Sequence, residues 1–449
     1  MAFDLQKWQT TLDEHTANGM TPGVSLAVLA DGEVHTAASG VLNIATGVEA
    51  TTDSVFQIGS VTKLYTSTIL LALSDEGLLD VDEPIVTYLP ELTWPDPDAR
   101  RSVTTRHLLT HTSGIDGDHF LDLGRGEDVL SRYVDTLGEL TQVLPVGAAW
   151  SYCNTGFAVA GRLVEKLTGL TFDEAVMQRL FAPLGLDHSC TLPEEALKFR
   201  AAYGHVPSAE GLELAPTVST PRTMGSAGGI ISTAYDVIEF ARLYLNDGVS
   251  RSGDRLLSED SVLEALTPQA VVWDPSMASH WGLGWMLTEW GGKRVVGHDG
   301  GTVGQGAFLR MIPEDGIAIA LVGTGPGIAG LMKPLFDGIV GELSGVRPPE
   351  SARPSDDTVT EQPWFGVYER KNMRIEVDHS ADGPAVSIEI AGLAAESLGT
   401  DSVTGELEIA ADGTYLTNAF GEWMPIVPFT IDDGTDGLHF AGRAQPRAN

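Results

Sequence analysis

A serine and a lysine three residues apart are the first side chains in this sequence whose types and spacing suit a reaction. Ser60 follows the apolar run 55–59, and Lys63 stands at the start of an apolar pattern over 64–73. The pattern predicts a buried helix that begins near Ser60 and ends at Gly77. Lys63 would lie about one turn along the same face, where a desolvated amine can lose its proton and serve the serine as a base.

This pair alone also has a plain structural interpretation, because a serine at a helix start commonly acts only as an N-cap. Further motifs favour catalysis by their order along the chain: LLTHTSG at 108–114, YCN at 152–154, WGLGW at 281–285 and GHDGGT at 297–302. Together with Ser60 and Lys63, these motifs resemble the serine β-lactamase and penicillin-binding-protein superfamily, specifically its class C and DD-peptidase-like branch. The resemblance covers roughly residues 10–345.

The resemblance implies a role for each matching residue. Ser60 would be the nucleophile, Lys63 its deprotonating partner, Tyr152 a proton relay, Asn154 the amide that orients lysine and substrate, and His298 the basic residue of a Lys/His-Thr-Gly strand. The backbone N–H groups of Ser60 and Gly301 would form the oxyanion hole. Asp299, Gly300 and Trp285 would contact substrate, and Asp299 departs from the family threonine, which bears on β-lactam affinity.

Three residues of these motifs, Tyr152, Cys153 and His298, have competing interpretations. A tyrosine beside an ammonium is expected to have a lowered pKa, although Tyr152 would also suit an ordinary core, and His298 a hydrogen-bonded sheet position. Cys153 is a rival nucleophile, but on an extended segment its side chain points away from Tyr152 and Asn154, which favours packing. His111 is interpreted as structural.

The elements that must position these residues predict an α+β fold. Apolar runs on either side of Asp31-Gly32 predict a strand, a tight turn and a strand. A mostly helical insertion is expected at about 80–220, and sheet patterns return between 281 and 322, with a closing helix over 331–343. The resemblance implies a β-lactamase-like antiparallel sheet flanked by helices, in a catalytic domain at 1–345.

A second domain is expected after this one. Three prolines at 348, 349 and 354 indicate a linker over 346–357. Short β-type runs from there to the end predict a small antiparallel barrel over 358–449, which is lipocalin-like by resemblance. The pattern GPGIAG at 325–330 matches a dinucleotide fingerprint, but the helix after it leads into the linker, so a βαβ unit cannot close.

Composition narrows the choice of partners. A formal net charge of −35 disfavours nucleic acid and anionic membranes. Cys153 and Cys190 are too few for a disulfide framework and lack zinc spacing, so no metal and no cofactor are expected. The start MAFDLQKW lacks the basic and apolar regions of a secretory signal, so a cytoplasmic location is expected.

Among cytosolic relatives, the chain looks most similar to stand-alone penicillin-binding-protein-type thioesterases that cyclise nonribosomal peptides. Ser60 would take a linear peptide from a carrier-protein thioester, and the peptide's own amine would release it as a ring; the acylating residue would be D-configured. Carrier proteins are usually acidic, so docking would need a basic patch, for which Arg100, Arg101 and Arg106 are candidates.

Two alternatives remain open from the sequence. A cytosolic hydrolase of esters or D-amino-acid amides needs the same catalytic residues and no site for an amine nucleophile. A catalytically silent binding module that kept the pocket is the third hypothesis, and labelling of Ser60 by a fluorophosphonate or a penicillin would exclude it.

Overall fold

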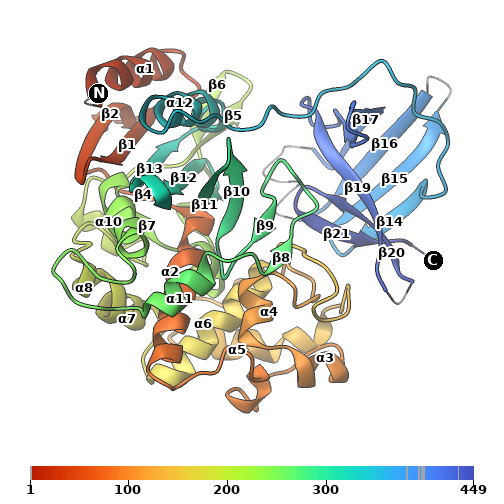
Figure 1. Cartoon of the computed structure of the whole chain (residues 1–449), viewed down its shortest axis with the longest axis horizontal. Helices are drawn as coiled ribbons and strands as arrows, with labels where there is room; N and C mark the ends of the chain where they lie inside the picture. Colours follow the sequence, from red (N-terminus) through yellow and green to blue (C-terminus); the bar gives the residue numbers. More distant parts are fainter. Residues whose placement is uncertain (1–2, 381–382, 393–394, 396–399, 433, 449) are drawn as a thin grey trace.

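The chain folds into two parts, a large α+β part and a smaller barrel at the C-terminal end (Figure 1). This computed structural model describes residues 3–448 apart from 381–382, 393–394, 396–399 and 433. A nine-stranded antiparallel sheet organises the large part, with strand order β3-β2-β1-β13-β12-β11-β10-β9-β8. The predicted α+β fold is therefore confirmed.

The large part consists of the nine-stranded sheet, two small two-stranded sheets (β4-β7 and β5-β6) and the helices around them. Its helices are α1 (Leu5–Ala17), α2 (Thr62–Asp75), α3 (Pro97–Ser102), α4 (Thr105–Leu109), α5 (Val129–Asp135), α6 (Asn154–Thr168), α7 (Phe172–Val176), α8 (Ala182–Leu184), α9 (Gly225–Gly228), α10 (Ala234–Leu245), α11 (Glu259–Ala265) and α12 (Ile328–Leu343). Its strands are β1 (Gly23–Ala30), β2 (Glu33–Asn43), β3 (Val48–Glu49), β4 (Phe56–Gln57), β5 (His205–Ser208), β6 (Gly211–Leu214), β7 (Ile231–Ser232), β8 (Ala270–Val271), β9 (His280–Trp281), β10 (Met286–Trp290), β11 (Lys293–Thr302), β12 (Gln305–Ile312) and β13 (Ile317–Thr324).

Helices cover both faces of the sheet, which explains why β1 is buried along its whole length. On one face, α1 and α12 bury Trp8, Leu12 and Phe336 against the sheet. On the other face, α2 and α10 pack into the main core. The hairpin between β1 and β2 turns at Asp31 and Gly32, which both have positive φ, as the Asp-Gly signal predicts.

Two expectations about element boundaries need correction. The helical insertion is shorter than 80–220, because α3 to α8 span 97–184 and the following segment carries the small hairpin β5–β6. The pattern at 281–287 is not one strand: Gly282 donates to the carbonyl of Trp285 in a tight turn between β9 and β10. Gly284 adopts a φ of +89° in this turn.

Two of the glycines at 325–330, Gly325 and Gly327, pack against the N-terminal segment. The N–H of Gly327 donates to the carbonyl of Met20, and a methyl group on Gly327 would lie 2.6 Å from Oγ1 of Thr21. Strand β13 is antiparallel to both its neighbours, β1 and β12. This geometry agrees with the exclusion of a dinucleotide fold.

The C-terminal part is a nearly closed eight-stranded antiparallel barrel, as predicted in outline. Its strands are β14 (Gly366–Arg370), β15 (Met373–Ser380), β16 (Gly383–Ile390), β17 (Ser402–Ile409), β18 (Tyr415–Thr417), β19 (Met424–Thr430), β20 (Asp436–Phe440) and β21 (Arg443–Pro446). A bridge between Tyr368 and Arg447, and a bond from the N–H of Ala448 to Val367, join its first and last strands. Tyr368, Ile388 and Phe440 lie in its core.

Two features typical of other protein classes do not occur in the described ranges. There, no helix is long and apolar enough to cross a membrane. No group of three or more His, Cys, Asp or Glu side chains suited to a metal ion occurs in those ranges either. Cys153 and Cys190 are free and buried.

Candidate active site

Ser60 lies where a short 3-10 turn, Gly59–Val61, leads into α2. Strand β11 passes directly against this turn. Gly59 has a φ of +50°, and a methyl group there would lie 2.6 Å from the backbone nitrogen of Gly301. Only glycine fits such a conformation and contact. The close approach brings the Ser60 turn and the Gly301 backbone together, as the predicted oxyanion hole requires.

Lys63 is fully buried and its Nζ has three partners. These are Oγ of Ser60 at 2.9 Å, Oδ1 of Asn154 at 2.8 Å and the carbonyl of Ala227 at 2.7 Å. The two carbonyl oxygens can only accept, whereas a hydroxyl can donate. An ammonium could donate to all three oxygens, whereas a neutral amine would donate to the two carbonyls and turn its lone pair toward the Ser60 hydroxyl.

Electrostatics favour the neutral form of Lys63. Burial is the main cause that brings the pKa of Lys63 well below its usual range, and the nearby Arg443 guanidinium lowers it further. The structure thus places an amine poised as a base at hydrogen-bond distance from the serine hydroxyl.

Asn154 begins α6 and connects Lys63 to an acidic residue. Its Nδ2 donates to Oδ1 of Asp118 at 3.1 Å, while its own Oδ1 accepts from Lys63. The N-cap of α6 is Cys153, whose sulfur accepts from the N–H of Gly156 at 3.2 Å. Burial raises the pKa of the Cys153 thiol to about 11, so this cysteine is a packing residue with little thiolate character.

Tyr152 lies beside Ser60, and the interaction between their side chains lowers the pKa of the phenol. Its ring centre lies 4.9 Å from Nζ of Lys63 and 4.3 Å from the ring of His111. The expected fall in its pKa is wrong: burial raises the pKa of Tyr152, and Arg443 offsets only part of that rise. Tyr152 is therefore a protonated phenol beside the serine, suited to donating a proton to a leaving group.

His298 lies buried on β11, with its ring 6.1 Å from that of Tyr152. Its Nδ1 is 2.6 Å from the carbonyl oxygen of Asp299, an acceptor, so Nδ1 carries the proton and Nε2 a lone pair. Within the described part of the chain Nε2 has no hydrogen-bond partner. Burial lowers the pKa of His298 to about 3, so the ring is neutral.

The three residues predicted to contact substrate lie in different surroundings. Gly300 adjoins the Ser60 turn, since a methyl group on it would lie 3.0 Å from the backbone nitrogen of Ser60. Trp285 is a wrong prediction, because it is fully buried in the core with its ring 4.6 Å from Tyr244. Asp299 pairs with Arg310 at 3.0 Å, on the face of β11 opposite His298.

His111 is a structural residue, as predicted. Its Nδ1 accepts from the N–H of Cys153 at 2.9 Å, and its ring packs among Tyr152, Trp150 and Trp281. It has a left-handed φ of +58°, and its ring packs against that of Tyr152.

Three residues at the site were missed by sequence reasoning. Arg443 of the barrel lies 4.6 Å above the ring of Tyr152, and together with Arg370 it pairs with Asp118. The main chains also join, since the N–H of Tyr152 donates to the carbonyl of Gly442 at 2.9 Å. Asp118, Arg370 and Arg443 are single charged residues outside any recognisable motif, so the sequence offered no signal for their place at the site.

Comparison with known proteins assigns most of the chain to one family. The sequence matches the β-lactamase family over residues 8–336. It is 44% identical to "Penicillin-binding protein 4" of Amycolatopsis lactamdurans over 380 residues, which cover 83% of this chain and 99% of that protein.

Two solved structures are similar to this fold. The crystal structure of SurE matches with a TM-score of 0.81 and 25% identity over 99% of both chains. A D-amino acid amidase from Ochrobactrum anthropi SV3 matches with a TM-score of 0.63 and 26% identity, over 76% of this chain and 100% of that one. The protein belongs to the β-lactamase and penicillin-binding-protein superfamily of serine acyl-enzyme hydrolases and transferases.

Proposed function

We propose that the protein is a trans-acting peptide cyclase. Ser60 takes a linear peptide from a carrier-protein thioester, and the peptide's N-terminal amine then displaces Ser60 to close a head-to-tail ring. The observation that carries the proposal is the position of the barrel: Arg443 and Gly442 contact Tyr152 directly, so the second domain forms part of the site wall. The likeness to SurE includes this domain, because it extends over 99% of the chain.

The residues present support each chemical step. In acylation, the Ser60 hydroxyl gives its proton to Lys63 as its oxygen bonds to the thioester carbon. The backbone N–H groups of Ser60 and Gly301 stabilise the oxyanion. Tyr152 then protonates the departing thiolate and regains a proton from Lys63, which leaves an ester on Ser60.

Ring closure follows the same route in reverse. The peptide's amine attacks the ester carbon and loses a proton to the Tyr152–Lys63 pair, and Ser60 leaves with a proton returned from that pair. Cyclisation exceeds hydrolysis only if water is kept from the ester while the amine is held close to it. A barrel wall against Tyr152 supports that requirement.

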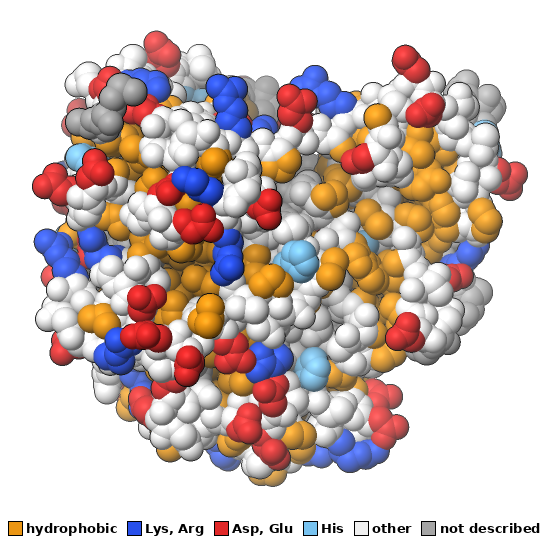
Figure 2. Space-filling view, viewed as in Figure 1, with side chains coloured by type: hydrophobic (Ala, Val, Ile, Leu, Met, Phe, Trp, Pro, Cys, Tyr) orange, Lys and Arg blue, Asp and Glu red, His pale blue; other side chains and the backbone are white. Residues whose placement is uncertain are grey.

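The carrier-protein partner needs a docking surface, and the predicted basic patch does not supply one. Arg106 pairs with Asp82 and Glu264, and Arg101 pairs with Asp98. Arg100 donates to backbone carbonyls. On the face in Figure 2, acidic and basic side chains are interspersed. A carrier would therefore dock by shape and apolar contact, against overall charge repulsion.

A linear peptide with a C-terminal D-residue, activated as a small thioester, tests the proposal. Product mass is the readout, with Ser60→Ala as the inactive control and the C-terminal L-peptide as the matched substrate. A ring, lighter than the free acid by one water, is the expected product from the D-peptide. Free acid as the sole product would contradict cyclisation.

The second candidate is a hydrolase of D-amino-acid amides or esters. The likeness to the D-amino acid amidase favours it, since that enzyme matches over its whole length. Release of ammonia from D-phenylalanine amide at a rate comparable with turnover of the peptidyl thioester would support this candidate.

A further inference from the structure

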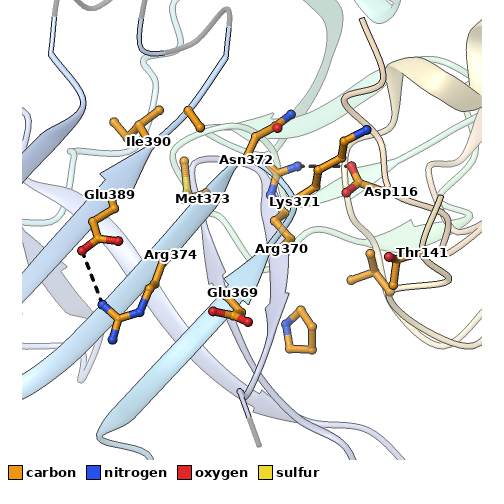
Figure 3. Close-up of a pocket in the computed structure, with 13 residues that line it drawn as sticks. Asp116, Thr141, Glu369, Arg370, Lys371, Asn372, Met373, Arg374, Glu389 and Ile390 are labelled. Atoms are coloured by element: carbon orange, nitrogen blue, oxygen red, sulfur yellow. Dashed lines mark ion pairs between the residues drawn. The ribbon is translucent and has the colours of Figure 1, made fainter. Parts of the chain in front are cut away.

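The C-terminal barrel is connected to the catalytic lysine through one carboxylate. Arg370 of β14 donates from Nη1 to Oδ2 of Asp118 at 2.7 Å. Arg443 of β21 donates to both oxygens of Asp118, from Nε at 3.0 Å and from Nη2 at 2.9 Å. Figure 3 shows Arg370 of the barrel pointing toward Asp116, and both residues line a pocket of about 640 Å³.

The remaining bond of Asp118 leads inward. Oδ1 of Asp118 accepts from Nδ2 of Asn154, and Oδ1 of Asn154 accepts from Nζ of Lys63. A continuous hydrogen-bonded chain therefore runs from two barrel arginines through Asp118 and Asn154 to the catalytic base.

We propose that Asp118 is a positioning residue that fixes the orientation of the Asn154 amide, and that the barrel arginines hold Asp118 in the charged state that this task requires. An ionised carboxylate only accepts hydrogen bonds, so the NH2 group of Asn154 must face Asp118. The amide oxygen is then forced toward Lys63. This orientation gives the neutral Lys63 a second acceptor and leaves its lone pair for Ser60.

The charge on Asp118 depends on the barrel. Its side chain is only 11% exposed, and burial alone would favour the protonated acid. Arg443 and Arg370 overcome this effect and hold the pKa of Asp118 well below its usual range. A protonated Asp118 could donate to Asn154 and let the amide turn over, which would set an NH2 group against the amine of Lys63.

Arg443 also acts on the base directly. Its positive charge lowers the pKa of Lys63, whereas the charge of Asp118 raises it. The two residues therefore have opposite electrostatic effects on Lys63 while they serve the same geometric purpose. Substitutions of Arg443 and of Asp118 should therefore shift the pKa of Lys63 in opposite directions, which a purely structural role would not predict.

The test is the pH dependence of Ser60 labelling by a fluorophosphonate, followed by intact mass on the full chain. Asp118→Asn is expected to label more slowly at every pH, on the order of 10²-fold, without an upward shift of the pH midpoint. Arg443→Gln is expected to shift the midpoint to higher pH and to recover rate in alkaline buffer. Arg374→Gln, which removes a barrel charge paired with Glu376, should match wild type in both respects.

Thermal unfolding separates these effects from loss of folding. If Asp118→Asn does not accumulate as folded protein, Arg370→Gln tests the same connection in a milder form. It removes one of the three arginine bonds to Asp118 and one of the two charges that keep this carboxylate ionised, so it should fold and label more slowly than wild type, by a smaller factor than Asp118→Asn. A folded Asp118→Asn that labels at the wild-type rate would overturn the inference, as would an Arg370→Gln with unchanged labelling. The inference rests on the proposed roles of Ser60 and Lys63. Wild-type protein that fails to label would refute those roles instead.

Discussion

At the scale of single residues, the protonation state of Lys63 determines whether the Ser60 hydroxyl has a base that can take its proton. Two carbonyl acceptors and one hydroxyl can accommodate a neutral amine, and burial, which lowers the pKa of Lys63, favours that form. An ordinary lysine loses its proton near pH 10.4. A lowered pKa makes the base available at lower pH, since the uncharged fraction rises as pH passes the pKa.

A neutral Lys63 that acts as the base predicts a particular pH profile for acylation. Acylation of Ser60 should increase with pH and reach its plateau well below the usual lysine range. A neutral His298, with its pKa at about 3, should add no step near pH 6.5. The measurement is the rate of fluorophosphonate labelling from pH 4 to 11, and a rate still climbing above pH 10 would contradict the assignment.

Removal of the base or the acid should slow the reaction without unfolding the protein. Lys63→Ala and Tyr152→Phe are each expected to reduce acylation by about 10² to 10⁴-fold, the usual range for a positioned acid or base. Tyr65→Phe is a matched control, because the hydroxyl of Tyr65 has no partner in the described structure. Burst kinetics with an activated ester report the rate, and full activity in Lys63→Ala would refute its role as the base.

The sequence predicts that Ser60, Lys63, Tyr152, Asn154 and His298 share one site, because each lies in a short local motif and the motifs follow one another in a recognisable order. The hydroxyl and amine share one helix, and the others lie in short recognisable runs. Asp118 and Arg443 were not predictable, because they are 325 residues apart and meet only after the barrel docks. The direction of the pKa shift of Tyr152 also depended on burial, which the sequence does not specify.

At the scale of elements, the site depends on β11 lying against the turn before α2. A methyl group on Gly300 would lie 2.0 Å from the carbonyl oxygen of Ile58, a backbone atom that cannot move without shifting the strand. Gly300 is thus required by the approach of two backbones, and the proposed oxyanion hole depends on that approach.

A substitution at this contact should therefore affect catalysis and stability together. Gly300→Ala is expected to lower acylation on the order of 10²-fold, comparable with the loss of one oxyanion donor, and to lower the melting temperature. Gly330→Ala is the control: it lies in α12, where an added methyl group meets nothing within 4 Å. It should stabilise the protein by about 0.5–1 kcal/mol with activity unchanged. Wild-type acylation in Gly300→Ala would contradict this account of the oxyanion hole.

Elements were predictable where local chemistry decides them. The Asp-Gly hairpin and the closing helix follow from turn preferences and apolar spacing. The sheet pattern that begins at 281 did not reveal the turn between β9 and β10, which Gly282 and Gly284 allow, because the residues around these glycines are apolar. The barrel was predicted only in outline, as a series of short β-type runs, because short strands depend on pairing with distant neighbours.

At the scale of the whole molecule, net charge opposes an acidic carrier protein. With a charge of −35 and the candidate arginines 100, 101 and 106 already bonded, long-range forces should be repulsive. Added salt screens such repulsion over distances of about 10 Å at 0.1 M.

Salt should therefore accelerate the carrier-dependent reaction. Between about 50 and 300 mM salt, kcat/KM for a carrier-bound peptide is expected to rise severalfold. The same peptide on a small uncharged thioester should show little change and serves as the control. A fall in kcat/KM with salt for the carrier-bound peptide would instead indicate a local basic docking site.

The most direct test of the central claim compares two peptidyl thioesters that differ only at the N-terminus. With a free amine, full-length enzyme should form the ring and show little acyl-enzyme by intact mass. With an acetylated N-terminus, the peptide should remain on Ser60 as a slowly hydrolysed ester. Rapid release of linear acid from both peptides at equal rates would contradict the claim that the Ser60 ester is protected from water and reserved for an amine.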